Sequence, residues 1–200
     1  VTDGKDVSNF EYYPDGQIAS YRRDAENAEE FIWDNLALIS RSTLNAERRT
    51  VNDYTIEPHV NGGSPILVSH EDTKAQSILF NDMLGSSLGV VENGTFTGIE
   101  RSAFGEQLEN PSASFGSSQT TDNGQPTTDF WTGKPAVDGL GYAFLFRNYR
   151  ADTGKWMSAD PLGYPDGWNN LAYCGNKTNY KLDRYGLEEL STSQYQAFIA

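Results

Sequence analysis

Residues 147–164 read RNYRADTGKWMSADPLGY, residues 165–180 continue as PDGWNNLAYCGNKTNY, and residues 181–187 close with KLDRYGL. Two turn motifs that begin with an aspartate frame this stretch, Asp160-Pro161-Leu162-Gly163 and Asp183-Arg184-Tyr185-Gly186-Leu187. Arg147 stands at its start. Two carboxylates and one guanidinium, placed on turns that an aromatic segment joins, are predicted to converge on one site.

The residues alone leave two interpretations of the aspartates open. An aspartate followed by Pro, or by two residues and Gly, commonly forms a turn by bonding its own backbone, and this structural interpretation is the one that Asp160 and Asp183 favour by themselves. The other is an acid/base pair, because two carboxyls in close contact share one proton. Arg147 is then either a surface arginine or a cation that holds one aspartate ionised or stabilises an oxyanion.

Composition points to strands and limits the class of partner. The 200 residues include 12% aromatic residues and 19 glycines, while hydrophobic residues make up only 37%, a balance that favours β-structure over helix. The formal net charge of −13 argues against nucleic acid and anionic membrane as partners, since both require a basic surface.

Several site classes are not expected. Cys174 is the one cysteine, so no intrachain disulfide can form, and it is predicted to be a small buried residue. His59 and His70 lack neighbouring metal-ligand residues, so we expect neither a metal nor a cofactor. No apolar run reaches the roughly 18 residues of a membrane span. The start at Val1, with neither Met nor signal-peptide features, suggests an internal segment of a longer polypeptide.

A repeated pattern lies upstream. Residues 10–18 read FEYYPDGQI and residues 31–39 read FIWDNLALI, so each copy places two aromatics on one strand face ahead of a turn. A looser copy follows at residues 78–86, and Asn93-Gly94 between β-prone runs predicts another hairpin. Residues 26–41 also fit a helix, but the shared register favours a strand from Phe31, with a helical turn confined to residues 24–30.

The predicted organisation has four parts. Residues 1–109 form an antiparallel hairpin strip, and the Ser/Thr/Gly-rich residues 110–129 form a flexible polar loop. Residues 130–187 resume the aromatic strands. Residues 188–200 lean towards helix but are too few for a domain. The predicted fold class is therefore mainly β, with short helical pieces.

The segment from Phe130 to Leu187 resembles the Rhs-repeat-associated core domain of bacterial Rhs and YD-repeat proteins, which include the C component of insecticidal toxin complexes. The residues that carry the resemblance are Phe130 to Gly133, Leu140-Gly141-Tyr142, Arg147 and Tyr149, Thr153 to Trp156, Ser158, Asp160 to Gly163, Asn170-Leu171, Tyr173, Asp183 and Gly186-Leu187. The copies at Phe10 and Phe31 resemble the YD repeat, and residues 83–86 resemble the element that precedes the core.

The resemblance implies a fold, a function and a location. YD repeats form a β-strip that spirals into a shell around a variable C-terminal polypeptide, often a toxin, so the expected partners are the rest of that shell and the enclosed polypeptide. The core acts as an aspartic autoprotease, which places Asp160, Asp183 and Arg147 at the catalytic positions and the cut between Leu187 and Glu188. Secretion or display at a bacterial cell surface follows from the same resemblance.

Three departures from the family pattern leave a second interpretation open. Arg184 replaces the usual proline of the closing motif, so the turn is less preset. Tyr13 stands at a motif aspartate, and Arg150 stands where a core aspartate is common. The alternative is a non-cleaving YD-repeat protein with a surface, adhesion or structural role, in which the aspartates only shape turns. A carbohydrate-binding module, suggested by the Trp and Tyr content alone, is the weakest interpretation.

Overall fold

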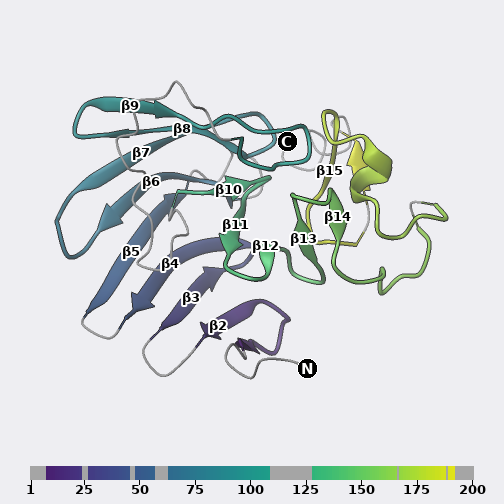
Figure 1. The fold of residues 1–200 in the computed structure, drawn as a ribbon, viewed down its shortest axis with the longest axis horizontal. Helices are drawn as coiled ribbons and strands as arrows, with labels where there is room; N and C mark the ends of the chain where they lie inside the picture. The colour runs from purple at the N-terminus through teal and green to yellow at the C-terminus, as the bar shows by residue number, and fades with distance from the viewer. Residues whose placement is uncertain are drawn as a thin grey trace, which may run out of the picture.

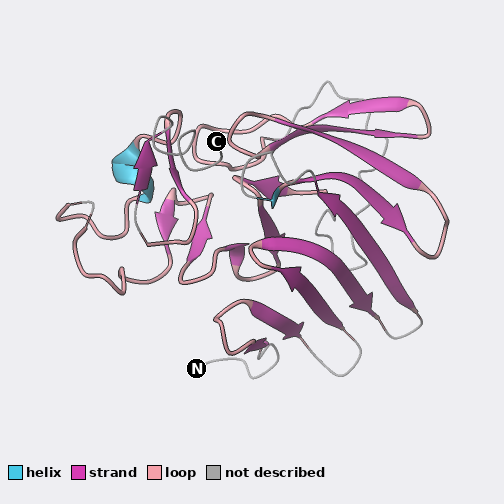
Figure 2. Cartoon of the chain, turned by 180° about the vertical axis from the view of Figure 1, so that it is seen from behind, coloured by secondary structure: helices cyan, strands magenta, loops and turns pink. Residues whose placement is uncertain are grey.

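The computed structural model of the protein describes residues 8–23, 27–45, 48–56, 63–108, 128–165 and 167–187, together with the backbone of 189–191. These residues form antiparallel β-structure with almost no helix (Figures 1 and 2), which confirms the predicted mainly β fold. They are arranged as a nine-stranded sheet, a five-stranded sheet and a two-stranded sheet.

The nine-stranded sheet is a strip in which each strand pairs with the next along the chain. Its strands are β1 (Asn9–Tyr12), β2 (Ile18–Arg22), β3 (Ala28–Asp34), β4 (Ala37–Leu44), β5 (Arg49–Ile56), β6 (Pro65–His70), β7 (Gln76–Asn81), β8 (Ser87–Glu92) and β9 (Thr95–Gly98). The three predicted hairpins, at Asp15-Gly16, at residues 35–37 and at Asn93-Gly94, are all confirmed. Asn93 and Gly94 both have positive φ, 50° and 77°, as the tight turn between twisted strands requires.

The aromatic repeat is buried only in part. Phe31 is fully buried, Ile32 points outward and Trp33 packs against the core, as alternation along a strand predicts. In the first copy Phe10 stacks on Tyr21, whereas Tyr12 is exposed. The register shifts between Glu11 and Tyr12, and such a bulge re-aims the side chain that follows it.

The predicted helical pieces are wrong wherever the structure describes them. Residues 28–30 belong to β3, and β16 (Glu189–Ser191) pairs with β15 (Lys181–Asp183) as a strand. Residues 24–26, 188 and 192–200 of those segments lie outside the described residues. Local helix preference is worth little per residue, and the pairing of β3 with both β2 and β4 outweighs it.

One end of the five-stranded sheet lies against a face of the strip, and its other end lies beside the strip (Figure 1). It contains β10 (Phe130–Trp131), β11 (Lys134–Val137), β12 (Gly141–Ala143), β13 (Asn148–Arg150) and β14 (Lys155–Trp156). One apolar core joins the two sheets, with Phe31, Leu38, Tyr54, Val68 and Leu79 on the strip and Phe130, Val137, Leu140 and Ala143 opposite them. Burial of this face fixes the later segment on the strip.

A buried ion pair also ties the two sheets together. Arg41 on β4 bonds both carboxylate oxygens of Glu29 on β3, at 3.0 and 2.8 Å, and the two side chains are 1% and 0% exposed. The other terminal nitrogen of Arg41 donates to the carbonyl of Ala136 on β11, at 3.2 Å. A buried charge needs hydrogen-bonding partners, and this contact uses one of them to hold β11 against the strip.

A second core, made of aromatic rings, lies under the segment that carries the predicted site. Trp131 stacks on Tyr149 at 4.5 Å between centroids and contacts Tyr173 at 4.7 Å, and the set also includes Tyr142, Phe144, Trp156 and Cys174. Cys174 is 2% exposed, which confirms its prediction as a small buried residue. This cluster supports β13, β14 and η2 (Tyr173–Asn176), the short 3-10 turn near the C-terminal end.

Most of the predicted polar loop lies outside the described residues. At its end Thr128 and Asp129 are buried, and Asp129 accepts a hydrogen bond from Arg101 at 2.6 Å. In the part of the chain that the structure describes, no helix has both the length and the apolar content needed to cross a membrane.

Candidate functional site

Arg147, Asp160 and Asp183 meet in the structure although they come from three separate turns. Arg147 lies between β12 and β13, Asp160 follows β14, and Asp183 ends β15. One terminal nitrogen of Arg147, Nη2, lies 2.8 Å from Oδ2 of Asp160 and 3.2 Å from Oδ2 of Asp183. All three side chains are 2% exposed. The carboxylate oxygens are therefore within about 6 Å of each other, the range that one bridging water spans.

Asp183 organises the closing turn with its own carboxylate. Its Oδ1 accepts the backbone N–H groups of Tyr185, Gly186 and Leu187, at 3.0, 2.6 and 3.1 Å. Gly186 adopts φ 80°, which a side chain would disfavour, and brings its N–H round to the carboxylate. The carboxylate thus shapes the turn through Oδ1 and directs Oδ2 towards Arg147.

Asp160 divides its two oxygens in the same way. Oδ1 accepts the N–H of Leu162 at 2.8 Å, and the N–H of Gly163 closes the turn on the Asp160 carbonyl at 3.0 Å. Oδ2 is left for Arg147. The two turns therefore present one carboxylate oxygen each to the same guanidinium.

One aromatic ring and three backbone carbonyls fix the position of the Arg147 guanidinium. Its guanidinium lies over the ring of Trp156, with 4.2 Å between the carbon Cζ and the ring centroid, and the stacked arginine keeps its N–H groups free in its own plane. Nε donates to the carbonyl of Gly186 at 2.6 Å, and Nη1 donates to the carbonyl of Asn170 at 3.2 Å. Nη2 also donates to the carbonyl of Leu187 at 3.2 Å.

The terminal nitrogen Nη2 of Arg147 has fewer hydrogens than it has neighbouring oxygens. Nη2 carries two hydrogens but faces three oxygens, one each from Asp160, Asp183 and Leu187. Burial raises the pKa of Asp183 to about 6, while the turn N–H groups and Arg147 act to lower it. A proton held on one of the two carboxyls would relieve the shortage, so the arrangement suits a pair that shares one proton.

The residue expected to precede the cut lies in this cluster. The carbonyl of Leu187 contacts Arg147, and the turn that contains Arg184 in place of proline closes through Asp183. Glu188, on the other side of the predicted cut, is outside the described residues. Of the two departures upstream, Arg150 pairs with Asp152 in solvent, and the hydroxyl of Tyr13 donates to the carbonyl of Phe31 at 3.0 Å.

Three further residues contact the site and had no assigned role in the sequence. Trp156 supports the guanidinium, the Asn170 carbonyl accepts from it, and the hydroxyl of Tyr173 accepts the N–H of Asp183 at 3.2 Å. Trp156, Asn170 and Tyr173 are part of the quoted motif, which was the available signal. Lys134 on β11 is buried over the ring of Phe144, and its sequence neighbours give no indication of this burial.

His70, the histidine that the structure describes, is bonded to uncharged side chains. His70 is buried between Asn52 and Ser77, with ring nitrogens 2.6 and 2.8 Å from their side-chain oxygens. His59 lies outside the described residues. Among the residues that the structure describes, no group of three or more His, Cys, Asp and Glu side chains could hold a metal ion.

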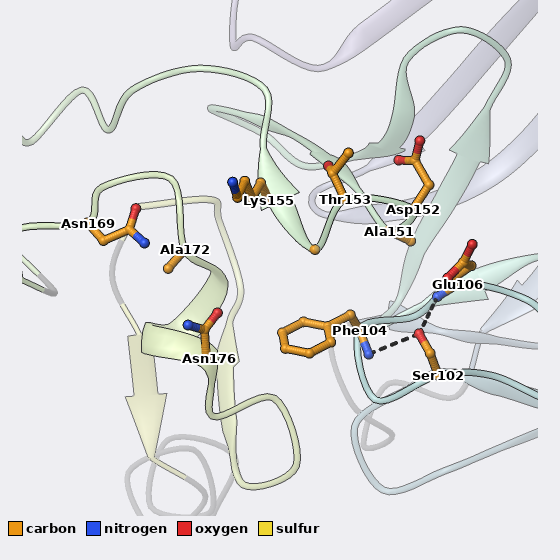
Figure 3. A pocket seen from close by; sticks show the side chains of 11 residues that line it. Ser102, Phe104, Glu106, Ala151, Asp152, Thr153, Lys155, Asn169, Ala172 and Asn176 are labelled. Carbon is orange, nitrogen blue, oxygen red and sulfur yellow. Dashed lines mark hydrogen bonds between the residues drawn. The ribbon is translucent and has the colours of Figure 1, made fainter.

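A separate cavity of about 310 Å³ lies beside η2 and the β13–β14 turn (Figure 3). Phe104, Asp152, Lys155 and Asn176 are among the residues that line it. Ser102 braces its rim by accepting the N–H groups of Phe104 and Glu106, the two dashed contacts in Figure 3. None of Arg147, Asp160 and Asp183 lines this cavity, so it is distinct from the three-residue site.

Comparison with known proteins shows the fold. No protein-family model and no curated protein matches the chain. The solved structures that share its fold include TcdB2–TccC3–TEV, with a TM-score of 0.66 and 19% identity over 94% of this chain. They also include the Tc holotoxin pore of Photorhabdus luminescens with a mutated TccC3, at 0.64 and 20% over 94%. TcdB2–TccC3 without its hypervariable C-terminal region matches at 0.57 and 18% over 90%. This chain spans only 9 or 10% of those chains.

Proposed function

We propose that the chain is the core end of an Rhs-type β-shell that encloses a C-terminal polypeptide and releases it by aspartic autoproteolysis after Leu187. The observation that carries the proposal is the contact of one guanidinium with both aspartates and with the carbonyl of the residue before the cut. The chain shares its fold with TcdB2–TccC3 chains, one of which was solved without its hypervariable C-terminal region, and a variable region at that end supports a C-terminal passenger. Secretion from a bacterium is part of the same proposal.

The geometry supports a hydrolytic mechanism. One carboxylate removes a proton from water, and the water oxygen attacks the carbonyl carbon of Leu187. Arg147, which already donates to that carbonyl oxygen, stabilises the negative charge that develops on it. The protonated carboxyl then donates its proton to the leaving amine of Glu188 as the C–N bond breaks. The raised pKa of Asp183 makes it the better candidate for the protonated partner near neutral pH.

Intact-mass analysis of the full-length parent tests the proposal. The wild-type chain is expected to yield a C-terminal fragment that begins at Glu188. Asp160→Asn and Asp183→Asn are expected to abolish cleavage, because each keeps the shape of its turn but removes the ionisable proton. Asp152→Asn is the matched control, since this exposed aspartate pairs with Arg150 and should leave cleavage unchanged.

Arg147→Ala and Arg184→Pro refine the assignment. If Arg147 only tuned the charge of the site, Arg147→Ala would slow cleavage less than either aspartate substitution. Its contacts predict instead that Arg147→Ala abolishes cleavage, because two buried carboxylates would lose their cation. Arg184→Pro should leave cleavage equal or faster, since it presets the turn. An Asp160→Asn chain still cut after Leu187 would refute the acid/base pair. A wild-type chain that remains uncut while its shell folds would support the non-cleaving alternative.

A further inference from the structure

The mechanism above does not use the cavity of about 310 Å³ beside η2. Three segments meet there: the turn of residues 102–106, which follows β9, the turn between β13 and β14, and residues 169–176, which include η2. Small-molecule sites in proteins have volumes of about 300–1,000 Å³. The cavity therefore has the size of a site for a small ligand.

The apolar side of the cavity is the ring of Phe104, whose position is fixed by its neighbours. The hydroxyl of Tyr149 donates to the Phe104 carbonyl at 3.0 Å, and Ser102 Oγ accepts the Phe104 N–H at 3.3 Å. Gly154 lies close to the ring, since an added Cβ there would be 3.2 Å from Cδ1 of Phe104. Figure 3 shows the ring extending from its turn towards Asn176. A flat ring held in this way offers a surface on which a second ring can pack.

Polar side chains from the other two segments surround this ring. Lys155 on β14 and Asn169 extend towards each other in Figure 3, and Asn176 lies across from the ring. An isolated β-bridge pairs Lys155 with Ala172 and so holds the start of η2 beside β14. Asn176 has φ 63°, a left-handed conformation that Asn tolerates better than most residues. Two amides and one ammonium thus offer both hydrogen-bond donors and acceptors around the ring.

The charges of the lining favour a neutral ligand. Glu106, Asp152 and Lys155 are the charged residues among the described residues that line the cavity. Arg150 pairs with Asp152, with 2.9 Å between Nε and Oδ1, and Lys155 offsets the charge of Glu106. An ion would lose part of its hydration here without meeting an excess of the opposite charge. Amides that both donate and accept match hydroxyl groups, which do the same.

We propose that this cavity binds a small neutral carbohydrate, a mono- or disaccharide. The C–H groups on one face of a sugar ring pack on the ring of Phe104, and the sugar hydroxyls bond with Asn169, Asn176 and Lys155. The inference goes beyond autoproteolysis, because the three residues of the autoproteolytic site do not line the cavity. Binding and cleavage can therefore be measured separately.

Saturation-transfer NMR on the full-length parent tests the proposal with lactose, maltose and N,N′-diacetylchitobiose as probes. At least one of these sugars is expected to bind. Phe104→Leu removes the aromatic ring, and Asn176→Gly removes the amide while accepting the positive φ, so each should weaken binding by about three- to tenfold. Trp168→Ala is the matched control, because Trp168 is 93% exposed but does not line the cavity. This control should bind as the wild type does.

Lysine acetylation of the wild-type parent, followed by mass spectrometry, does not depend on the folding of any variant. Lys155 is exposed at the cavity, so a bound sugar should slow its acetylation about twofold when half of the sites are occupied. Lys74, exposed in the turn between β6 and β7, is the control and should react at an unchanged rate.

Four results would overturn the proposal. The first is that none of the three sugars binds, and the second is that binding is lost in Trp168→Ala but kept in Phe104→Leu. The third is an equal acetylation rate of Lys155 with and without the sugar that binds. The fourth is a Lys155 that fails to react even without sugar, which would show that another part of the parent covers the cavity. Neither measurement requires cleavage, so a parent that never cuts would refute the autoprotease and leave this test intact.

Discussion

At the scale of single residues, Asp183 shows how one side chain serves both the fold and the candidate chemistry. Its Oδ1 accepts three backbone N–H groups and so forms the closing turn, while Oδ2 shares a guanidinium nitrogen with Asp160. Three hydrogen bonds and a cation would normally keep a carboxyl ionised at low pH. Burial outweighs them and raises its pKa to about 6.

The raised pKa of Asp183 predicts how stability depends on pH. Since its folded pKa lies above the unfolded value, the folded chain binds the extra proton, and this contribution to stability is complete below about pH 4. It is lost as pH rises through about 6, a decrease of up to about 3 kcal/mol in the free energy of unfolding. Unfolding midpoints of wild type and Asp183→Asn between pH 4 and 7 measure it. The variant should lack the decline, and equal pH slopes would contradict the prediction.

At the scale of elements, the site is built where short strands pass into turns. Asp160 and Asp183 each begin a turn, and the short strands β14 and β15 bring these turns to Arg147. The aromatic cluster beneath them supplies the rigidity that loops alone lack, since Trp156 carries the guanidinium and Tyr173 bonds the backbone of Asp183.

Gly186→Ala tests how tightly the closing turn fits the arginine. Gly186 has φ 80°, and an added Cβ would lie 3.1 Å from the backbone nitrogen of Arg147 and 3.2 Å from Cβ of Phe144. We expect the variant to lose about 1–3 kcal/mol of stability and to cut poorly, because the strain displaces Arg147. Gly94→Ala is the matched control, with φ 77° and nothing within 4 Å of its added Cβ. Chemical denaturation measures the stability of both variants, and intact mass measures their cleavage. Equal losses of stability in the two variants would show that the positive φ causes the loss and that the contact with Arg147 does not.

At the scale of the whole molecule, the strip is an open sheet. The strand order runs from β1 to β9, so both of these strands are edges within the described sheet. Its outer face at β7 to β9 also carries exposed apolar side chains, among them Ile78, Phe80, Leu88 and Phe96. Open edges and apolar patches call for neighbours, which a longer shell would supply.

The isolated 200-residue chain is therefore expected to associate or to be only marginally stable. Phe96 is 58% exposed on the edge strand β9, and a charge placed there disfavours pairing with another edge. Phe96→Lys should shift sedimentation towards monomer. Met83→Lys is the control, because Met83 is 74% exposed but lies in the turn between β7 and β8. A wild-type chain that sediments as a monomer and unfolds in one sharp transition would count against this prediction.

The sequence by itself determined the features that local chemistry controls. Turn-forming pairs such as Asp15-Gly16 and Asn93-Gly94 located the hairpins, and the alternation of side chains placed Phe31 and Trp33 on one strand face. Asp160 and Asp183 were singled out because an aspartate followed by turn residues has a recognisable form. These signals lie within a few residues of one another, so no knowledge of distant contacts was needed.

Only the tertiary structure decided what depends on partners far along the chain. Residues 28–30 and 189–191 lean towards helix, yet they are strands because β2 and β4, and then β15, offer them hydrogen bonds. The contact of Arg147 with the Leu187 carbonyl joins residues 40 positions apart. The burial of Lys134 over the ring of Phe144 likewise depends on how β11 packs. Long-range packing outweighs local preference, because each pairing satisfies several backbone groups whereas local propensity differs by less than about 1 kcal/mol per residue.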